Sequence, residues 1–371
     1  MHALLAVIAL VVSPAPPTTY WVHSPAEFRD AVVATKSTGG NIVLFPGRYA
    51  EPLVVSGRGP NRIIGRPGAI VQTLVLDHTR RVSVGPLRVS PLTGNALVSV
   101  TGSRNINLHD LKVSAEGTRY SAGVDIPDST WVSIQQSQFS HCGDRSPDWV
   151  NCLRVQAGAR HVSVVHDWFH DCLGCDFLHG RVHDHLTVRS SRFERALPCD
   201  LRKIDGRLLR INLGRYASVR CKHQDLIELF AGDDLRFVRN YFGVYKAGGA
   251  QLYVTGESRR TLIAHNVFRG TDRRVPGWRA PVGVLIGGGS GGPIPTYVRV
   301  EHNKIYTGAA RRDGYAGSIS ISRGYGWRIP RPQRPVIAHN VIGLLKTPSR
   351  LCNGAKMIDN TILRGQDCRK S

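Results

Sequence analysis

The chain has 371 residues, of which 42% are hydrophobic and 20% are charged, a composition that excludes a disordered protein and fits a globular one. Its formal net charge is +22 at pH 7, from 49 lysines and arginines against 27 aspartates and glutamates. A positive field of this size favours polyanionic partners: nucleic acid, anionic lipid or acidic polysaccharide.

The first element we expect is a secretory signal peptide over residues 1–19. An apolar run, Leu4–Val12, is followed by small residues and prolines, and it is too short to span a membrane. No later stretch is long and apolar enough to cross a bilayer. We therefore predict an exported, extracellular protein whose mature chain, residues 20–371, has no integral membrane segment.

A short amphipathic helix and a strand should come next. The stretch "SPAEFRDAVVAT" (24–35) has a serine N-cap before helical apolar spacing, and "GGNIVLFPGRYAEPLVV" (39–55) is interpreted as the first coil of a repetitive stack. A helix in this place would cover the open end of a repetitive stack, as the terminal caps of repeat proteins do.

An eight-residue pattern then recurs along the chain, for example "VSVGPLRV" (82–89), "VSIQQSQF" (132–139) and "TLIAHNVF" (261–268). The third and eighth positions are apolar in every copy, and a second alternating run such as "GVDIP" or "AQLYV" precedes each copy. Two or three short strands in every 24–30 residues predict a parallel β-helix. Stacked coils would align the sixth position into an amide ladder and the eighth into an aromatic column. The ladder residues are Asp167, Asn240, Asn266, Asn303, Asn340 and Asn360, and the column residues are Phe139, Phe169, Phe193, Phe242 and Phe268.

These features give the chain a resemblance to the right-handed parallel β-helix proteins of the pectate-lyase-like superfamily. It covers residues 20–365 and rests on the helix before "NIVLFPGRY" and on the V-x-I-x-x-N-x-F ladder. The resemblance implies an all-β, single-stranded right-handed parallel β-helix with an N-terminal capping helix. It also implies extracellular action on polysaccharides, often uronic-acid polymers, by β-elimination, hydrolysis or epimerisation.

Eight cysteines agree with export, because disulfides form in oxidising compartments. Cys142 with Cys172, and Cys152 with Cys175, are expected to stack on adjacent coils at a spacing compatible with disulfides. A zinc site at the C-x-x-C of 172–175 is the alternative, although no second close pair accompanies it. Two further pairs would bound an insertion at about 199–221 and staple the C-terminal edge: Cys199 with Cys221, and Cys352 with Cys368.

A β-helix core is filled with side chains, so a site should lie in a groove on an outer sheet. Counting back from the repeats predicts one outward column with further polar residues beside it. The column contains Asp125, Arg154, Glu228 and Tyr253, and beside it are Asp176, His179, His223, Asp225 and Gln251.

Within this region, "HQDLIE" (223–228) resembles in placement the N-T-D-G-I-D stretch of polygalacturonases, in which the aspartate of N-T-D is a catalytic acid. His223 and Asp225 occupy the Asn and Asp places, but the first residue differs and Leu226 replaces Gly, so hydrolase chemistry does not follow. On a strand, His223 and Asp225 would share one face, where a carboxylate can orient an imidazole for proton transfer. The structural alternative is a surface turn pair that closes the insertion.

We therefore expect a carbohydrate-active enzyme that cleaves a uronate-containing polysaccharide by β-elimination. The candidate catalytic residues are His223, Asp225, Glu228 and Tyr253, and the candidate substrate-binding residues are Arg154, Lys222, Lys246 and Gln251. Two alternatives stay open: a glycoside hydrolase that uses Asp225 and Glu228, and a non-catalytic polysaccharide-binding surface protein. No protein metal ligands are assigned, and Ca²⁺ is the one cofactor considered. We expect a monomer that does not bind nucleic acid, because no reading module is present.

Overall fold

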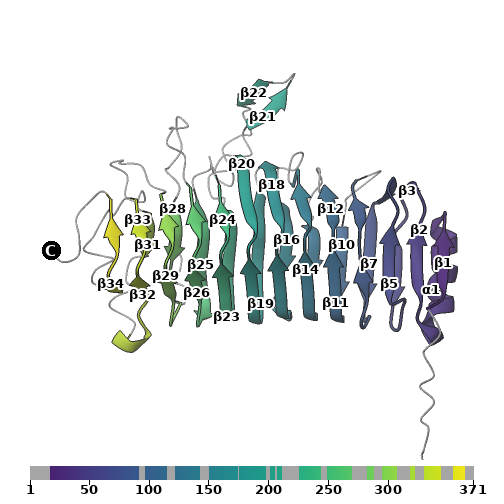
Figure 1. Ribbon diagram of the computed structural model, residues 1–371, viewed down its shortest axis with the longest axis horizontal. Helices are drawn as coiled ribbons and strands as arrows, with labels where there is room; N and C mark the ends of the chain where they lie inside the picture. Colours follow the sequence, from purple (N-terminus) through teal and green to yellow (C-terminus); the bar gives the residue numbers. More distant parts are fainter. Residues whose placement is uncertain are drawn as a thin grey trace, which may run out of the picture.

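The computed structural model describes residues 17–91, 97–114, 122–142, 150–173, 175–197, 201–204, 207–210, 225–243, 249–269, 282–287, 295–306, 318–321, 330–343 and 354–363. The chain winds into a right-handed parallel β-helix whose coils stack along one long axis (Figure 1). This confirms the predicted fold class.

Each coil contributes strands to three faces, and every strand pairs in parallel with its counterparts in the neighbouring coils. The first face contains β4 (Leu53–Ser56), β7 (Thr73–Asp77), β10 (Leu97–Thr101), β13 (Ala122–Ile126), β16 (Val150–Val155), β19 (Cys175–Arg189), β23 (Ile227–Val238), β25 (Ala250–Arg259), β28 (Val282–Ile286) and β31 (Ile319–Ile321).

The second face is joined to the first, because the long strands β19 and β23 run through the corner between them. It also contains β1 (Thr19–Val22), β2 (Asn41–Leu44), β5 (Arg62–Gly65), β8 (Ser83–Val84), β11 (Arg104–His109), β14 (Thr130–Gln135), β17 (Arg160–Val165), β26 (Leu262–Ala264), β29 (Arg299–Glu301), β32 (Val336–Ala338) and β34 (Lys356–Ile358).

The third face is a separate parallel sheet. It contains β3 (Gly47–Tyr49), β6 (Ala69–Val71), β9 (Leu87–Val89), β12 (Leu111–Ser114), β15 (Gln138–Ser140), β18 (Trp168–Leu173), β20 (Arg192–Leu197), β24 (Tyr241–Phe242), β27 (Val267–Phe268), β30 (Lys304–Ile305), β33 (Val341–Ile342) and β35 (Thr361–Ile362). A one-turn 3₁₀ helix, η1 (Arg331–Gln333), precedes β32.

Helix α1 (Pro25–Thr38) covers the N-terminal end of the stack, as the sequence predicts (Figure 1). The Ser24 hydroxyl accepts a hydrogen bond from the Glu27 amide at 3.2 Å, which satisfies a free amide of the first turn. Phe28, Ala31 and Val32 are buried in the common core, so the helix shields the first hydrophobic cross-section from water.

The amide ladder is present and runs through the corner between the second and third faces. The Oδ1 atom of Asn266 accepts the backbone N–H of Asn240 at 2.8 Å, and Asn303 accepts that of Asn266 at 2.8 Å. Asn340 and Asn360 continue the series, and Ser191 and Asp167 occupy the equivalent place in earlier coils. Each side chain thus satisfies a buried backbone amide of the preceding coil, which would otherwise cost about 1–3 kcal/mol.

The predicted aromatic column is also present. Ring centroids of Phe139, Phe169, Phe193, Phe242 and Phe268 follow one another at 4.5, 4.8, 5.2 and 4.4 Å, and all five side chains are fully buried. The spacing is that of stacked coils, so the rings fill the core of the central part of the helix.

The expected disulfide pairing is wrong for the four described cysteines. The structure joins Cys142 to Cys152 and Cys172 to Cys175, so each bond lies within one coil instead of between coils. Cys142 and Cys172 do occupy equivalent places, because His141 N–H donates to the Asp171 carbonyl in the next coil. The cysteine that closes each bond lies on the strand that follows within the same coil. Cys199, Cys221, Cys352 and Cys368 lie outside the described residues.

The predicted insertion contains a two-stranded antiparallel hairpin, β21 (Leu201–Ile204) and β22 (Arg207–Arg210). It projects away from the stack next to β20 (Figure 1). No helix in the described part of the chain is long and apolar enough to cross a membrane. The predicted signal peptide falls mostly on residues 1–16, which lie outside the described ranges.

Asp167 is the acidic member of the ladder, and this gives a test of the ladder. Its Oδ1 accepts the Ser137 amide at 2.7 Å, while its Oδ2 is buried and has no hydrogen-bond partner in the described part of the chain. Burial raises the pKa of Asp167 to about 7. Because this value lies above the pKa of an unfolded aspartate, its contribution to stability is lost as the pH rises through 7.

We expect Asp167→Asn to raise the free energy of unfolding by about 2 kcal/mol at pH 8, with little change at pH 4. Chemical denaturation at both pH values measures the difference. The reciprocal change Asn240→Asp should make the protein less stable as the pH rises. Equal pH dependence in the wild type and both variants would contradict this account of the ladder.

Candidate functional site

Five polar residues of the first face form one outward column. The register pairs Asp125 with Arg154, Arg154 with His179, His179 with Glu228, and Glu228 with Tyr253. The residues just before them in each strand point into the core, because side chains alternate along a strand. The predicted column of Asp125, Arg154, Glu228 and Tyr253 is therefore present, and His179 lies within it instead of beside it.

Arg154 is held by Asp125 in a bidentate ion pair. Its Nε donates to Asp125 Oδ1 at 2.9 Å and its terminal nitrogen donates to Oδ2 at 2.7 Å, while Gln156 Nε2 donates to the same carboxylate at 2.9 Å. The Arg154 side chain is 36% exposed. It is thus fixed in orientation, yet it remains open to a ligand on the outer surface.

His179 and Glu228 form the centre of the column, with 3.9 Å between Nε2 and Oε2. Burial, and then the charge of Arg154, lower the pKa of His179 to about 4. Burial raises the pKa of Glu228 to about 9, helped by the nearby Asp225 and Asp176 carboxyl groups. At neutral pH a neutral imidazole therefore lies beside a protonated carboxyl group.

The local backbone fixes the position of His179. Gly180 follows it with φ +153°, and a Cβ at that position would lie 1.7 Å from the Val155 carbonyl oxygen. Only glycine therefore allows the strand to continue at this point. The His179 ring also contacts Phe230 edge-on, with centroids 5.1 Å apart.

Asp176 and Asp225 lie behind the column and support the backbone. Asp176 Oδ1 accepts the Asp225 amide at 3.0 Å, and Asp225 Oδ1 in turn accepts the Ala250 amide. Both side chains are buried, and burial raises the pKa of Asp176 well above its ordinary value, with a further contribution from Asp225. The Asp225 carboxylate thus accepts a backbone hydrogen bond at the corner of the coil and does not face the outer surface.

Gln251 and Tyr253 are also buried. Gln251 is fully buried and its Nε2 donates to the carbonyls of Gly243 and Arg269, at 2.8 Å each. Tyr253 is 8% exposed and packs with Ala250 and Val282. Of the remaining predicted site residues, His223, Lys222 and Lys246 lie outside the described residues.

One set of side chains in the site could hold a metal ion. Asp176, His179 and Glu228 each offer one ligand atom, and these atoms all lie within 4.8 Å of one another. An imidazole with two carboxylates suits a transition metal better than Ca²⁺, which takes about six to eight oxygen ligands. The expectation of Ca²⁺ stays a prediction.

Counting from the repeats placed His179 beside the column because the strand is irregular immediately before it. Phe177 and Leu178 are both buried, and their amides both donate to the Leu226 carbonyl, at 3.0 and 3.1 Å. Two consecutive inward residues break strict alternation. The two large apolar residues in "CDFLHG" were the only signal of this break in the sequence.

No protein-family model matches the sequence, and no curated protein matches it significantly. Solved structures do resemble it. The surface adhesin PfbA of Streptococcus pneumoniae has a TM-score of 0.50 at 10% identity, over 92% of this chain and 88% of its own. The Dettilon tailspike protein gp208 has a TM-score of 0.53 at 9% identity, over 92% and 68%. Pectate lyase Pel9A has a TM-score of 0.39 at 11% identity, over 88% and 73%. At these identities the likeness concerns the β-helix fold alone.

The opposed pKa values of the column give a test that does not require a substrate. The folded-state pKa of Glu228, about 9, lies above its ordinary value of 4.5, so its contribution to stability is lost as the pH rises between these values. A glutamine in its place keeps the neutral form at every pH.

We expect Glu228→Gln to be more stable than the wild type by roughly 2 kcal/mol at pH 8, and equally stable at pH 4. Thermal or chemical unfolding at the two pH values measures this. Glu51→Gln, at a glutamate whose side chain is 67% exposed, is the matched control and should change stability little at either pH. A wild type as stable as Glu228→Gln at pH 8 would show that Glu228 is ionised there.

Proposed function

We propose that this protein is an exported polysaccharide lyase that cleaves a uronate-containing polymer by β-elimination across the outward column. The observation that carries the proposal is the His179–Glu228 pair, whose pKa values are moved in opposite directions, to about 4 and about 9. Two adjacent titratable groups separated in this way are a general base and a general acid, each in its working protonation state at neutral pH.

In the proposed reaction, the imidazole of His179 takes the proton from C5 of a uronate residue. The electrons of the C–H bond form the C4–C5 double bond, the C4–O4 bond breaks, and the departing O4 receives a proton from Glu228. Afterwards His179 releases its proton to water and Glu228 takes up a proton from water, which restores both groups. Arg154 contacts the uronate carboxylate from the exposed side of the column, and Tyr253 bounds the column at its other end.

Hydrolysis is less well supported, because it needs an ionised carboxylate together with an acid. The partner suggested by the sequence, Asp225, lies behind the column, where its Oδ1 accepts the Ala250 amide. Asp125 is ionically paired with Arg154 and is three coils away from Glu228, a distance of about 14 Å along the stack.

The test is an assay of the purified protein on polygalacturonate, alginate and a neutral glucan. We expect a product that absorbs in the ultraviolet with one of the uronate polymers and none with the glucan. His179→Gln and Glu228→Gln should each lower kcat by about 100-fold or more, the usual contribution of a positioned acid or base. The rate should rise as the pH passes 4 and fall as it passes 9.

The surface change Lys304→Gln, on the third face, is the control and should leave the rate unchanged. New reducing ends without ultraviolet absorbance would indicate a hydrolase instead of a lyase. Binding without turnover would favour a non-catalytic surface protein. Parallel assays with Ca²⁺ and with a chelator decide whether a cation takes part.

A further inference from the structure

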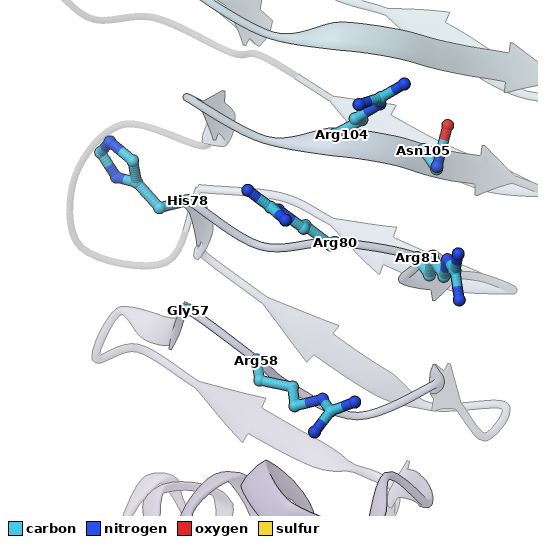
Figure 2. Close-up of a pocket in the computed structure, with 7 residues that line it drawn as sticks. All are labelled: Gly57, Arg58, His78, Arg80, Arg81, Arg104 and Asn105. Carbon is cyan, nitrogen blue, oxygen red and sulfur yellow. The ribbon is translucent and has the colours of Figure 1, made fainter.

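A second polar surface lies at the corner between the first and second faces, in the N-terminal coils. It is a groove of about 760 Å³ whose lining includes Arg58, His78, Arg80, Arg81, Arg104 and Asn105 (Figure 2). The outward column has no residue in this groove, and no catalytic or binding role described above includes it.

The arginines are placed by the coil stack itself. Arg80 forms a parallel bridge with Arg104 in the next coil, and the Arg81 amide donates to the Arg104 carbonyl at 3.0 Å. Residues paired in this way lie about 4.8 Å apart, so equivalent guanidinium groups are presented at the repeat distance of the fold. All four arginines are exposed. Figure 2 shows their side chains on neighbouring turns of the chain along one side of the stack.

Unlike several other arginines on the described surface, these four make no ion pair with a carboxylate in the described part of the chain. Arg154, Arg195, Arg260 and Arg299 are each paired with a carboxylate. Within the described ranges, no ion pair or side-chain hydrogen bond reaches the four groove guanidinium groups. The nearest acid along the chain, Asp77, contacts the ring of His78 at 2.8 Å. The groove therefore keeps its positive charge and is complementary to an anion.

An exposed aromatic platform continues the groove along the stack. Trp131 lies opposite Asn105, since Arg104 pairs with Thr130 and Ile106 with Val132. Trp131 is 50% exposed, and one face of its indole stacks on the His161 ring with centroids 3.9 Å apart and 5° between the planes. The stack holds the indole in place while half of the Trp131 surface stays exposed, and an exposed indole of this kind suits the apolar face of a sugar ring.

We infer that this groove is a second binding site, for an acidic polysaccharide that runs parallel to the helix axis. Carboxylate or sulfate groups on the polymer would pair with Arg80 and Arg104, and a pyranose ring would stack on Trp131. The site is separate from the outward column, and the inference does not depend on the column being catalytic. Nucleic acid is the less favoured polyanion, because the two disulfides indicate an oxidising, extracellular compartment.

The experiment measures the affinity of the full chain for polygalacturonate, dextran sulfate, neutral dextran and a short DNA duplex at two salt concentrations. His179→Gln serves as the background, so that the proposed elimination cannot shorten the polymer. Two double variants are made in this background. The groove pair carries Arg80→Gln and Arg104→Gln, and the control pair carries Arg88→Gln and Lys112→Gln. The control residues are exposed register neighbours on the third face and remove the same charge.

We expect the groove pair to bind acidic polysaccharide about tenfold more weakly than the background, and the control pair to stay within about twofold. The salt dependence should also become shallower in the groove pair. Trp131→Ala should weaken binding by a factor that salt does not change. The tighter of the two acidic polymers identifies the group as carboxylate or sulfate. Should the double variant fail to fold, the single change Arg58→Gln tests the same groove.

Three results would overturn the inference: equal losses in the groove and control pairs, equal binding of neutral dextran, or tighter binding of DNA that the groove pair abolishes. Failure of the proposed lyase activity is distinguishable, since it would leave polysaccharide binding by the groove intact. Conversely, a variant that loses only groove binding should still form the unsaturated product from a short oligosaccharide at the same rate, because a short substrate needs the outward column alone.

Discussion

The whole structure depends on one constraint: the backbone amides of each coil must be satisfied by the coils on either side of it. Strands meet this demand along the faces, but the corners have no regular partner. Side chains therefore supply it, with Asn266 and Asn303 at one corner and Ser103 and Ser129 at another. Because an unsatisfied buried amide is costly, these corners define the register of every coil, and the register in turn defines which residues become neighbours on the surface.

The electrostatics of the outward column follow from the same stacking. Stacking brings the Asp176 carboxyl group next to those of Asp225 and Glu228, which lie about 50 residues later in the sequence, and all three are withdrawn from water. Like charges at such distances cannot all be ionised, so protons are retained. His179 is dehydrated next to Arg154, and for that reason it stays neutral. Proton-transfer properties thus arise from the burial of ordinary side chains.

Much of the fold could be predicted from the sequence, because each eight-residue repeat contains the residues that satisfy the backbone amides of the neighbouring coil. Asn240 and its successors, the phenylalanine column and the capping helix all follow from counting. The site could be predicted only in part. Strict alternation of side chains correctly predicted Arg154, Glu228 and Tyr253 in the outward column. It failed at Phe177 and Leu178, two consecutive residues that both point inward, and His179 therefore lies in the column. Asp225 looked like an outward acid in "HQDLIE", whereas its carboxylate is used at a corner, and only tertiary contacts reveal this. The cysteines misled for a similar reason: equivalent places in neighbouring coils do not indicate which sulfur lies closest.

The placement of the disulfides has a mechanical consequence. Both described bonds close short segments within a coil, with sequence separations of 10 and 3 residues. Neither one crosses from one coil to the next, so neither resists separation of coils along the axis. Within the described coils, a pulling force along the axis would be opposed by interstrand hydrogen bonds, corner ladders and stacked rings, which can yield one coil at a time. Reducing agents should therefore leave the resistance of the described coils to stretching unchanged.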